Sequence, residues 1–174
     1  FSGQVRINVH TNYSGDGDTG DDVAVVKLFA PDTFGFDHWH RTRIYTGGQS
    51  PIGQMRLYGR GFSNKNGTGS SNLRYMNFNP DWWGTNHYFE RAYSRRVCNG
   101  DSGGPTIDWT PGGFRVVAGL HSNSTKSPTS GVCAMWNGKQ RSVRLATKIT
   151  WIEDMLDVTC RPFTDSGWNY VRCW

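Results

Sequence analysis

Short runs of apolar residues alternate along the chain with clusters of glycine, asparagine, aspartate, serine and proline. Runs of this length, bounded by turn-forming residues, are typical of β-strands. The clearest runs cover residues 5–9, 23–29, 54–58, 114–120 and 143–146. Residues 150–156, with Ile152 and Leu156 four positions apart, have the spacing of a helix instead. The pattern therefore predicts an all-β protein with one short helix near the C-terminus.

A segment rich in serine, asparagine and glycine follows the third of these runs, at residues 61–71. This composition is typical of a surface turn and also of a linker between domains. We favour the surface turn, because connecting segments of folded domains run over the protein surface.

The length of 174 residues suits one ordinary domain or two small packed lobes, and no apolar run is long enough to cross a membrane. The first residues lack the basic start and the apolar run of a signal peptide, so the chain as given looks mature or cut.

The net charge of +5 is spread along the chain, and its densest cluster consists of Arg91, Arg95 and Arg96. This pattern favours a solvated basic surface over a nucleic-acid site. The acidic run at residues 14–21 resembles a calcium loop only in part, because it lacks the full spacing and the terminal glutamate. We therefore expect no metal, no cofactor, and neither nucleic acid nor membrane as a partner.

The cysteines form an even set without a C-x-x-C pair: Cys98, Cys133, Cys160 and Cys173. This spacing argues against zinc and redox chemistry, so two disulfides are the simplest interpretation. Cys160 and Cys173 could close a short loop that orders residues 157–174. Disulfides indicate an oxidising compartment, and we expect a secreted, extracellular protein.

The most informative motif is Gly-Asp-Ser-Gly-Gly-Pro at residues 100–105. A serine hydroxyl becomes a useful nucleophile only when a turn presents it beside backbone donors and a base. The glycines permit a turn in which the N–H groups of Gly100 and Ser102 converge and could stabilise the oxyanion of a tetrahedral intermediate. Ser102 is therefore the candidate nucleophile, and a plain glycine-rich turn between strands is the alternative.

With Cys98 before it, this hexapeptide resembles the active-site signature of the trypsin-like (chymotrypsin-fold) serine protease family. Asp22, followed directly by an apolar run, resembles the acidic residue of that family's catalytic triad. Asp21 is an alternative one position away, but the family's acid directly precedes the apolar run. His10 and Tyr13 resemble the family's His-x-x-Tyr element, which belongs to an earlier strand.

The resemblance covers about residues 5–156. It implies two antiparallel six-stranded β-barrels, the first incomplete in this chain, with a short C-terminal helix. Residues 1–35 would end the N-terminal barrel and carry the catalytic aspartate. Residues 36–156 would form the C-terminal barrel with nucleophile, pocket and helix, and residues 157–174 would form a disulfide-stapled tail.

The catalytic histidine of the family stands about 45 residues before its aspartate, whereas only 21 residues precede Asp22. His10 belongs to the His-x-x-Tyr element and is not the base. None of the remaining histidines lies in the family's Ala-Ala-His-Cys context: His38, His40, His87 and His121. A barrel that lacks several strands exposes unpaired edges. The expected partner is therefore an N-terminal fragment that carries the catalytic histidine and stays non-covalently bound after a proteolytic nick.

Residues 1–3 also depart from the Ile/Val-Val-Gly-Gly start that activated members insert beside the aspartate before the serine. Asp101 then needs another partner, for which the N-terminal amine of the expected fragment is one candidate. A zymogen-like state stays open.

Residues 116–124 resemble the strand that pairs with the substrate backbone through a Ser-Trp-Gly segment in the family. Ser122 matches that serine, whereas Asn123 and Ser124 replace the tryptophan and the glycine. The resemblance also pairs Cys133 with the cysteine before the nucleophile.

Arg96 stands six positions before the nucleophile, at the family's pocket base, where a trypsin has aspartate. Its guanidinium could pair with a substrate carboxylate, and His121 and Ser124 stand where glutamate-specific relatives bind one. We expect an acidic residue before the scissile bond and a substrate pocket that includes Arg96, Asn99, His121, Ser122 and Ser124. The alternative is that Arg96 turns outward or pairs with an acid of the chain, leaving a small or polar pocket.

Together these residues predict a secreted serine endopeptidase with a Ser-His-Asp mechanism. The rival is a binding or regulatory module that keeps the protease fold without catalysis. The replaced tryptophan, the unusual start and the missing histidine favour this rival, whereas intact Ser102, Asp22 and glycine turn argue against it.

Overall fold

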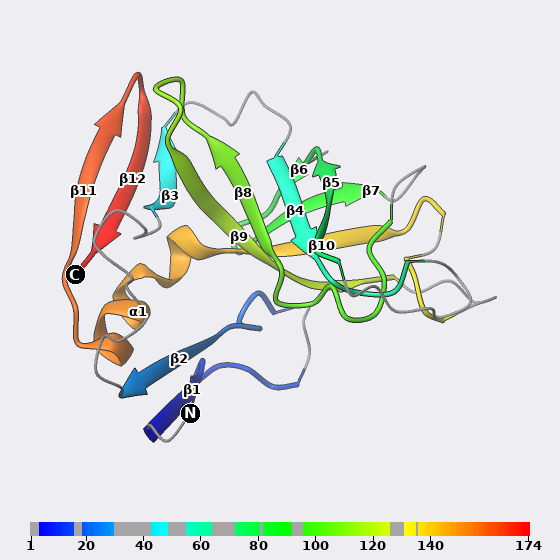
Figure 1. The fold of residues 1–174 in the computed structure, drawn as a ribbon, viewed down its shortest axis with the longest axis horizontal. Helices are drawn as coiled ribbons and strands as arrows, with labels where there is room; N and C mark the ends of the chain where they lie inside the picture. The colour runs from blue at the N-terminus through cyan, green and yellow to red at the C-terminus, as the bar shows by residue number, and fades with distance from the viewer. Residues whose placement is uncertain are drawn as a thin grey trace.

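The computed structural model describes residues 4–15, 19–29, 43–48, 55–63, 72–80, 82–91, 96–125, 131–134 and 136–174. These residues form strands, one short 3-10 helix and one α-helix (Figure 1). The strands are β1 (Gln4–Val9), β2 (Ala24–Phe29), β3 (Arg43–Gly48), β4 (Met55–Gly59), β5 (Arg74–Phe78), β6 (Trp82–Trp83), β7 (His87–Arg91), β8 (Pro105–Trp109), β9 (Arg115–Ser124), β10 (Lys139–Arg144), β11 (Cys160–Asp165) and β12 (Trp168–Cys173). The 3-10 helix η2 covers Leu145–Lys148, and the helix α1 covers Ile149–Leu156.

The strands form two sheets of very different size. β1 and β2 pair only with each other as an antiparallel hairpin, and the other strands join one ten-stranded sheet. Its main path runs β11-β12-β3-β9-β10-β7-β6, while β8 joins β9 and carries β4 and β5. The predicted all-β fold of the trypsin-like type is confirmed, although the barrel is not closed.

One strand pairing differs from the expected antiparallel pattern. β3 pairs with β9 in parallel, with Arg43 opposite Val116 and Ile44 opposite Val117. The two strands are far apart along the chain, and a parallel pair requires such a long connection. The predicted domain boundary at residues 35 and 36 lies outside the described residues.

The main hydrophobic core lies within the large sheet. Its fully buried side chains include Met55, Leu57 and Phe78, and the tail contributes Trp168 and Tyr170. The tail reaches this core because β12 pairs with β3, while Cys160 and Cys173 stand directly opposite each other and form a disulfide. The stapled tail therefore extends the large sheet.

Burial changes the acidity of three groups in this core. It raises the pKa of Tyr45 to about 12 and also raises the pKa of Tyr88. Burial raises the pKa of the Asp108 carboxyl as well, although the Trp109 N–H donates to Asp108 Oδ1 at 2.7 Å and partly offsets the shift. These shifts follow from the cost of moving a charged form out of water.

A second apolar cluster joins the small hairpin to the C-terminal helix. Val23 and Val25 alternate with exposed neighbours and pack with Leu145 and Ile152. Figure 1 shows β2 running beneath α1. Lys27 Nζ donates to the Leu156 carbonyl at 2.9 Å, where a free carbonyl at the helix end favours a cation. The predicted helix at residues 150–156 therefore forms and anchors the hairpin.

In the described part of the chain, no helix is long and apolar enough to cross a membrane.

Candidate active site

The serine-bearing turn begins at a disulfide. Cys98 and Cys133 are bonded and also form an isolated β-bridge. The Asn99 N–H donates to the Val132 carbonyl at 2.7 Å. The entrance to the turn is thus fixed to a second segment, and the expected Cys98–Cys133 pairing is present.

Inside the turn, two glycines adopt backbone conformations that other residues rarely take. Gly100 has φ +88° and Gly103 has φ +81°. The Asp101 N–H donates to the Cys98 carbonyl at 3.1 Å, and the Gly104 N–H donates to the Asp101 carbonyl at 3.0 Å. These consecutive turns leave Ser102 exposed at the outside of the loop.

The end of the turn is held by β9. The Gly103 N–H donates to the His121 carbonyl at 2.7 Å, and the His121 N–H donates to the Gly104 carbonyl at 2.8 Å. The serine turn is therefore paired directly with the strand that the sequence assigns to substrate binding.

Asp101 fastens the turn to the segment that follows β4. Its Oδ1 accepts from the Gly61 N–H at 2.8 Å, and its Oδ2 accepts from the Cys98 N–H at 2.9 Å. A Cβ on Gly59 would stand 2.1 Å from Asp101 Oδ1, and one on Gly61 would stand 2.6 Å from the Asn99 carbonyl oxygen. From the sequence, Gly61 is expected only as the start of a surface turn or, in the alternative, of a linker. The Gly-x-Gly spacing at the end of an apolar run is the signal that could have identified this contact.

Ser122 joins the two candidate catalytic side chains. Its Oγ donates to Asp22 Oδ2 at 2.7 Å, and its carbonyl oxygen accepts from Ser102 Oγ at 3.1 Å. Ser122 itself is buried. Asp22 and Ser102 therefore hydrogen-bond the same residue of β9, although 80 positions separate them in the sequence.

Asp21 and Asp22 point toward different partners. Asp21 Oδ1 accepts from Lys148 Nζ at 2.5 Å and lies 3.3 Å from His10 Nδ1. His10 also packs its ring against Trp151, with the centroids 4.9 Å apart. Of the two neighbouring carboxylates, only Asp22 contacts the residue that holds Ser102.

A comparison with protein families agrees with this geometry. A family model described as Trypsin matches residues 1–137. The chain belongs to the trypsin family. No curated protein matches it. The matched span includes the Asp22 segment, the serine turn, β9 and both cysteines of the first disulfide.

The described histidines of this trypsin-family chain lie in different surroundings from one another. His10 contacts Asp21, His87 packs against Phe89 with ring centroids 5.4 Å apart, and His121 is buried in β9. His38 and His40 lie outside the described residues.

The expected pocket residues fall into two groups. His121, Ser122 and Ser124 lie together on β9, and Ser124 Oγ is buried without a hydrogen bond to any residue the structure describes. Asn99 is exposed at the entrance to the serine turn. The Arg96 guanidinium instead lies 5.4 Å from the centroid of the Trp136 ring.

Arg96 also lines a hollow of about 310 Å³ beside Asp101. Leu57, Met76 and Arg74 form other parts of its wall. This hollow lies on the side of the turn where Asp101 accepts its backbone hydrogen bonds. An aspartate, two arginines and apolar side chains thus share one concave surface.

Gly104 shows how tightly the turn fits against β4. An added Cβ would stand 2.0 Å from the Tyr58 carbonyl oxygen and 2.8 Å from the Asp101 carbonyl oxygen, and both contacts are backbone. We expect Gly104→Ala to lower the free energy of unfolding by about 3 kcal/mol, because overpacking forces the backbone apart. Urea denaturation measures this loss.

Gly103→Ala is the matched control for that variant. Gly103, unlike Gly104, has a positive φ, but an added Cβ there meets no atom within 4 Å. It should cost only the strain of the left-handed conformation, about 1–2 kcal/mol. If the two variants are destabilised equally, the serine turn does not press on the Tyr58 carbonyl.

Proposed function

We propose that the chain is the nucleophile-bearing part of a secreted serine endopeptidase. The observation that carries this proposal is Ser122, which holds Ser102 through its carbonyl and Asp22 through its hydroxyl. In a trypsin-family chain, hydrogen bonds of these two side chains to the same residue of β9 support their roles as the acid and the nucleophile of a peptide hydrolase. The two disulfides support a secreted location.

In the proposed reaction, Ser102 Oγ attacks the peptide carbonyl as its proton passes to an imidazole held by Asp22. The negative charge that forms on the carbonyl oxygen is bound by the N–H groups of Gly100 and Ser102. Neither of these N–H groups donates a hydrogen bond to another described residue, so both can serve the oxyanion. The imidazolium then protonates the leaving amine. Water releases the acyl group by the same steps in reverse.

The imidazole is proposed to come from an N-terminal segment of the same protease, held without a covalent bond. The support lies on the outer face of the β1–β2 hairpin, where Val5, Ile7, Val9 and Val26 are 49–65% exposed. In the pairing of β1 with β2, Ile7 lies opposite Val26, so these side chains lie on one face of the hairpin. A contiguous exposed apolar face of this kind marks an interaction surface. The missing strands of the first barrel are the proposed occupant.

Asp101 is proposed to bind the N-terminal amine of that segment. Each of its carboxylate oxygens accepts one backbone N–H, and a carboxylate has capacity for further donors. The adjoining hollow, with Leu57 and Met76 in its wall, would accept the apolar side chains that follow such an amine. Activity would then depend on the cleavage that creates the amine, as in a zymogen.

An acidic residue before the scissile bond is the proposed preference. The buried Ser124 hydroxyl makes no hydrogen bond to any residue the structure describes, and His121 lies three positions earlier on the same strand. A hydroxyl and a protonated imidazole are suitable donors to a carboxylate. Arg96 would contribute through its positive charge from beside Trp136.

The test uses the protease together with its histidine-bearing segment and four peptides that differ only in the residue before the scissile bond. We expect kcat/KM for the glutamate peptide to exceed that for lysine, phenylalanine and alanine by about tenfold or more. Ser124→Ala should remove most of this advantage and leave the alanine peptide unaffected. A lysine preference contradicts the acidic pocket. If none of the four peptides is cleaved, the result contradicts the endopeptidase proposal and favours a catalytically inactive binding or regulatory module.

A further inference from the structure

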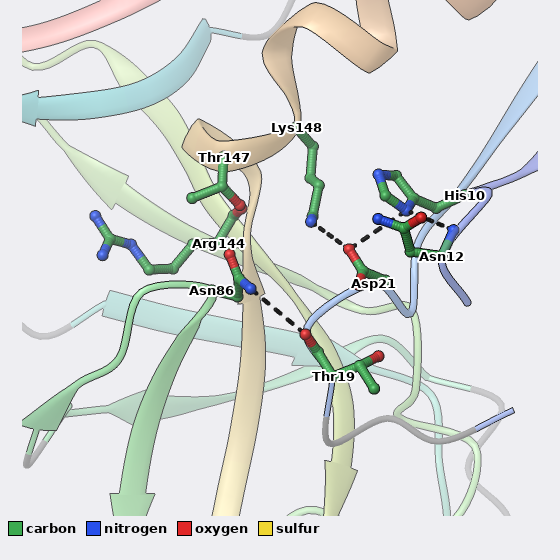
Figure 2. A network of polar contacts seen from close by, with 8 residues as sticks. All are labelled: His10, Asn12, Thr19, Asp21, Asn86, Arg144, Thr147 and Lys148. Carbon is green, nitrogen blue, oxygen red and sulfur yellow. Dashed lines mark hydrogen bonds and ion pairs between the residues drawn. The ribbon is translucent and has the colours of Figure 1, made fainter. Parts of the chain in front are cut away.

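The segment that carries Asp22 is held against the large sheet by a cluster of polar contacts (Figure 2). Asn86 Nδ2 donates to the Thr19 carbonyl at 3.5 Å. Gly20, with φ +78°, lies so close to Asn86 that an added Cβ would stand 2.3 Å from the Asn86 Cβ. The His10 N–H donates to the Val23 carbonyl at 3.0 Å. The segment at residues 19–23 is therefore anchored on both sides of Asp22.

A further anchor is the largely buried ion pair between Asp21 and Lys148. Figure 2 shows the Lys148 and His10 side chains converging on the Asp21 carboxylate. The Lys148 side chain is only 6% exposed and that of Asp21 14%, so water contributes little to either charge. A buried charge that loses its partner is strongly destabilising, and each group therefore fixes the other's position. The pair spans 127 positions of sequence and connects the first-barrel segment to η2.

This pair acts on Asp22 through a tight turn. The Val23 N–H donates to the Asp21 carbonyl at 2.8 Å, so Asp22 is the central residue of a three-residue γ-turn. The side chain before Asp22 is fixed on Lys148, and the Asp22 side chain itself is fixed on Ser122. Rotation of the turn would have to break both contacts. The direction of the Asp22 carboxylate thus depends on Lys148.

The pair also changes the charge around Asp22. Two adjacent carboxylates would repel each other at this partly buried place, and the Lys148 ammonium offsets the charge of Asp21. His10 Nδ1 lies 3.3 Å from the same carboxylate oxygen of Asp21. Asp22 is then left as the carboxylate directed at the active site.

We propose that Lys148 is a positioning residue for catalysis, which acts through Asp21 to hold the turn that directs Asp22 toward the catalytic imidazole. This inference rests on the proposed protease function for its kinetic consequence. The structural part of the inference, that the Ser122–Asp22 hydrogen bond depends on Lys148, does not rest on that function.

The test starts with Lys148→Met, which keeps the length of the side chain and removes its charge. We expect kcat to fall about 10–100-fold with KM within twofold of the parent, because small misplacements of a catalytic group have effects of this size. The melting temperature should fall as well, since the largely buried Asp21 carboxylate loses its ammonium partner. Lys148→Arg restores a cation and should recover part of kcat.

A double variant separates positioning from stability alone. Lys148→Met with Asp21→Asn removes both charges, so the melting temperature should recover while kcat stays low. Lys27→Met is the matched control, because Lys27 joins the same hairpin to α1 through the Leu156 carbonyl. It should keep the parental kcat.

Three results would overturn the inference or separate it from the protease proposal. If the parent cleaves peptides and Lys148→Met does so at the same kcat, Lys148 does not position Asp22. Full recovery of kcat in the double variant means that the ion pair serves stability only. If the parent cleaves nothing, the protease proposal fails, and a crystal structure of Lys148→Met then decides the inference. A Ser122–Asp22 hydrogen bond retained at its 2.7 Å distance would contradict it.

Discussion

Replacing Ser102 by alanine is expected to lower kcat for peptide hydrolysis by about a million-fold, the size of effect seen when a serine nucleophile is removed. The substitution deletes only the hydroxyl that donates to the Ser122 carbonyl. The turn itself should survive, because its hydrogen bonds involve the backbone of Asp101, Gly103 and Gly104 and the Asp101 side chain. The loss would therefore reflect chemistry and not unfolding.

Two measurements check this expectation on the protease with its histidine-bearing segment. Turnover of the glutamate peptide gives kcat, and a fluorophosphonate that labels activated serines reports the nucleophile directly. Ser14→Ala is the control, because Ser14 is an exposed serine near the Asp22 segment. It should keep full turnover and labelling. Labelling that persists in Ser102→Ala would place the nucleophile elsewhere.

The local features of this chain could be predicted from its sequence because they depend on short-range physics. The apolar run at residues 23–29 predicted β2, in which Val25 is buried and Val26 is exposed, while Val23 is buried directly before it. The four-residue spacing at Ile152 gave the helix α1. The glycines around Ser102 gave a turn, since Gly103 needs a positive φ that other residues rarely adopt.

The contacts that assemble the candidate site could not be predicted in the same way. Ser122 matched the substrate-binding strand of the family, but its hydrogen bond to Asp22 joins residues 100 positions apart. The pair of Asp21 and Lys148 spans a still longer stretch, and no periodicity in the sequence encodes it. Such pairings are set by how whole elements pack, so spacing and composition carry no signal for them.

The tail illustrates the same limit for the fold. The sequence indicated that Cys160 and Cys173 could close a loop, and the disulfide is present. Trp168 and Tyr170, which lie on the same tail, are each 5% exposed. They are buried because β12 pairs with β3, which places their side chains in the main core. Their burial depends on a strand more than a hundred positions earlier, which the local pattern of the tail does not reveal.

The second large effect is expected for Asp22→Asn, which should lower kcat about 10⁴-fold, the known size of this change in the trypsin family. An asparagine has nearly the same shape, and its Oδ1 can still accept from the Ser122 hydroxyl, which now donates to Asp22 at 2.7 Å. It cannot stabilise the positive charge of the imidazolium, and its amide favours the wrong tautomer of the ring. KM should change little, because Asp22 is not itself one of the proposed pocket residues and contacts them only through the Ser122 hydroxyl.

The melting temperature of Asp22→Asn should stay near that of the parent, which separates a catalytic loss from an unfolded protein. Asp154→Asn is the matched control, since Asp154 is an exposed aspartate on α1, and it should keep the parental kcat. Asp21→Asn adds a sharper comparison, because it removes the neighbouring carboxylate while the Asp22 side chain keeps its charge. If Asp21→Asn loses as much activity as expected for Asp22→Asn, while Asp22→Asn retains kcat, the acid of the triad is Asp21. The Ser122 contact would then be structural.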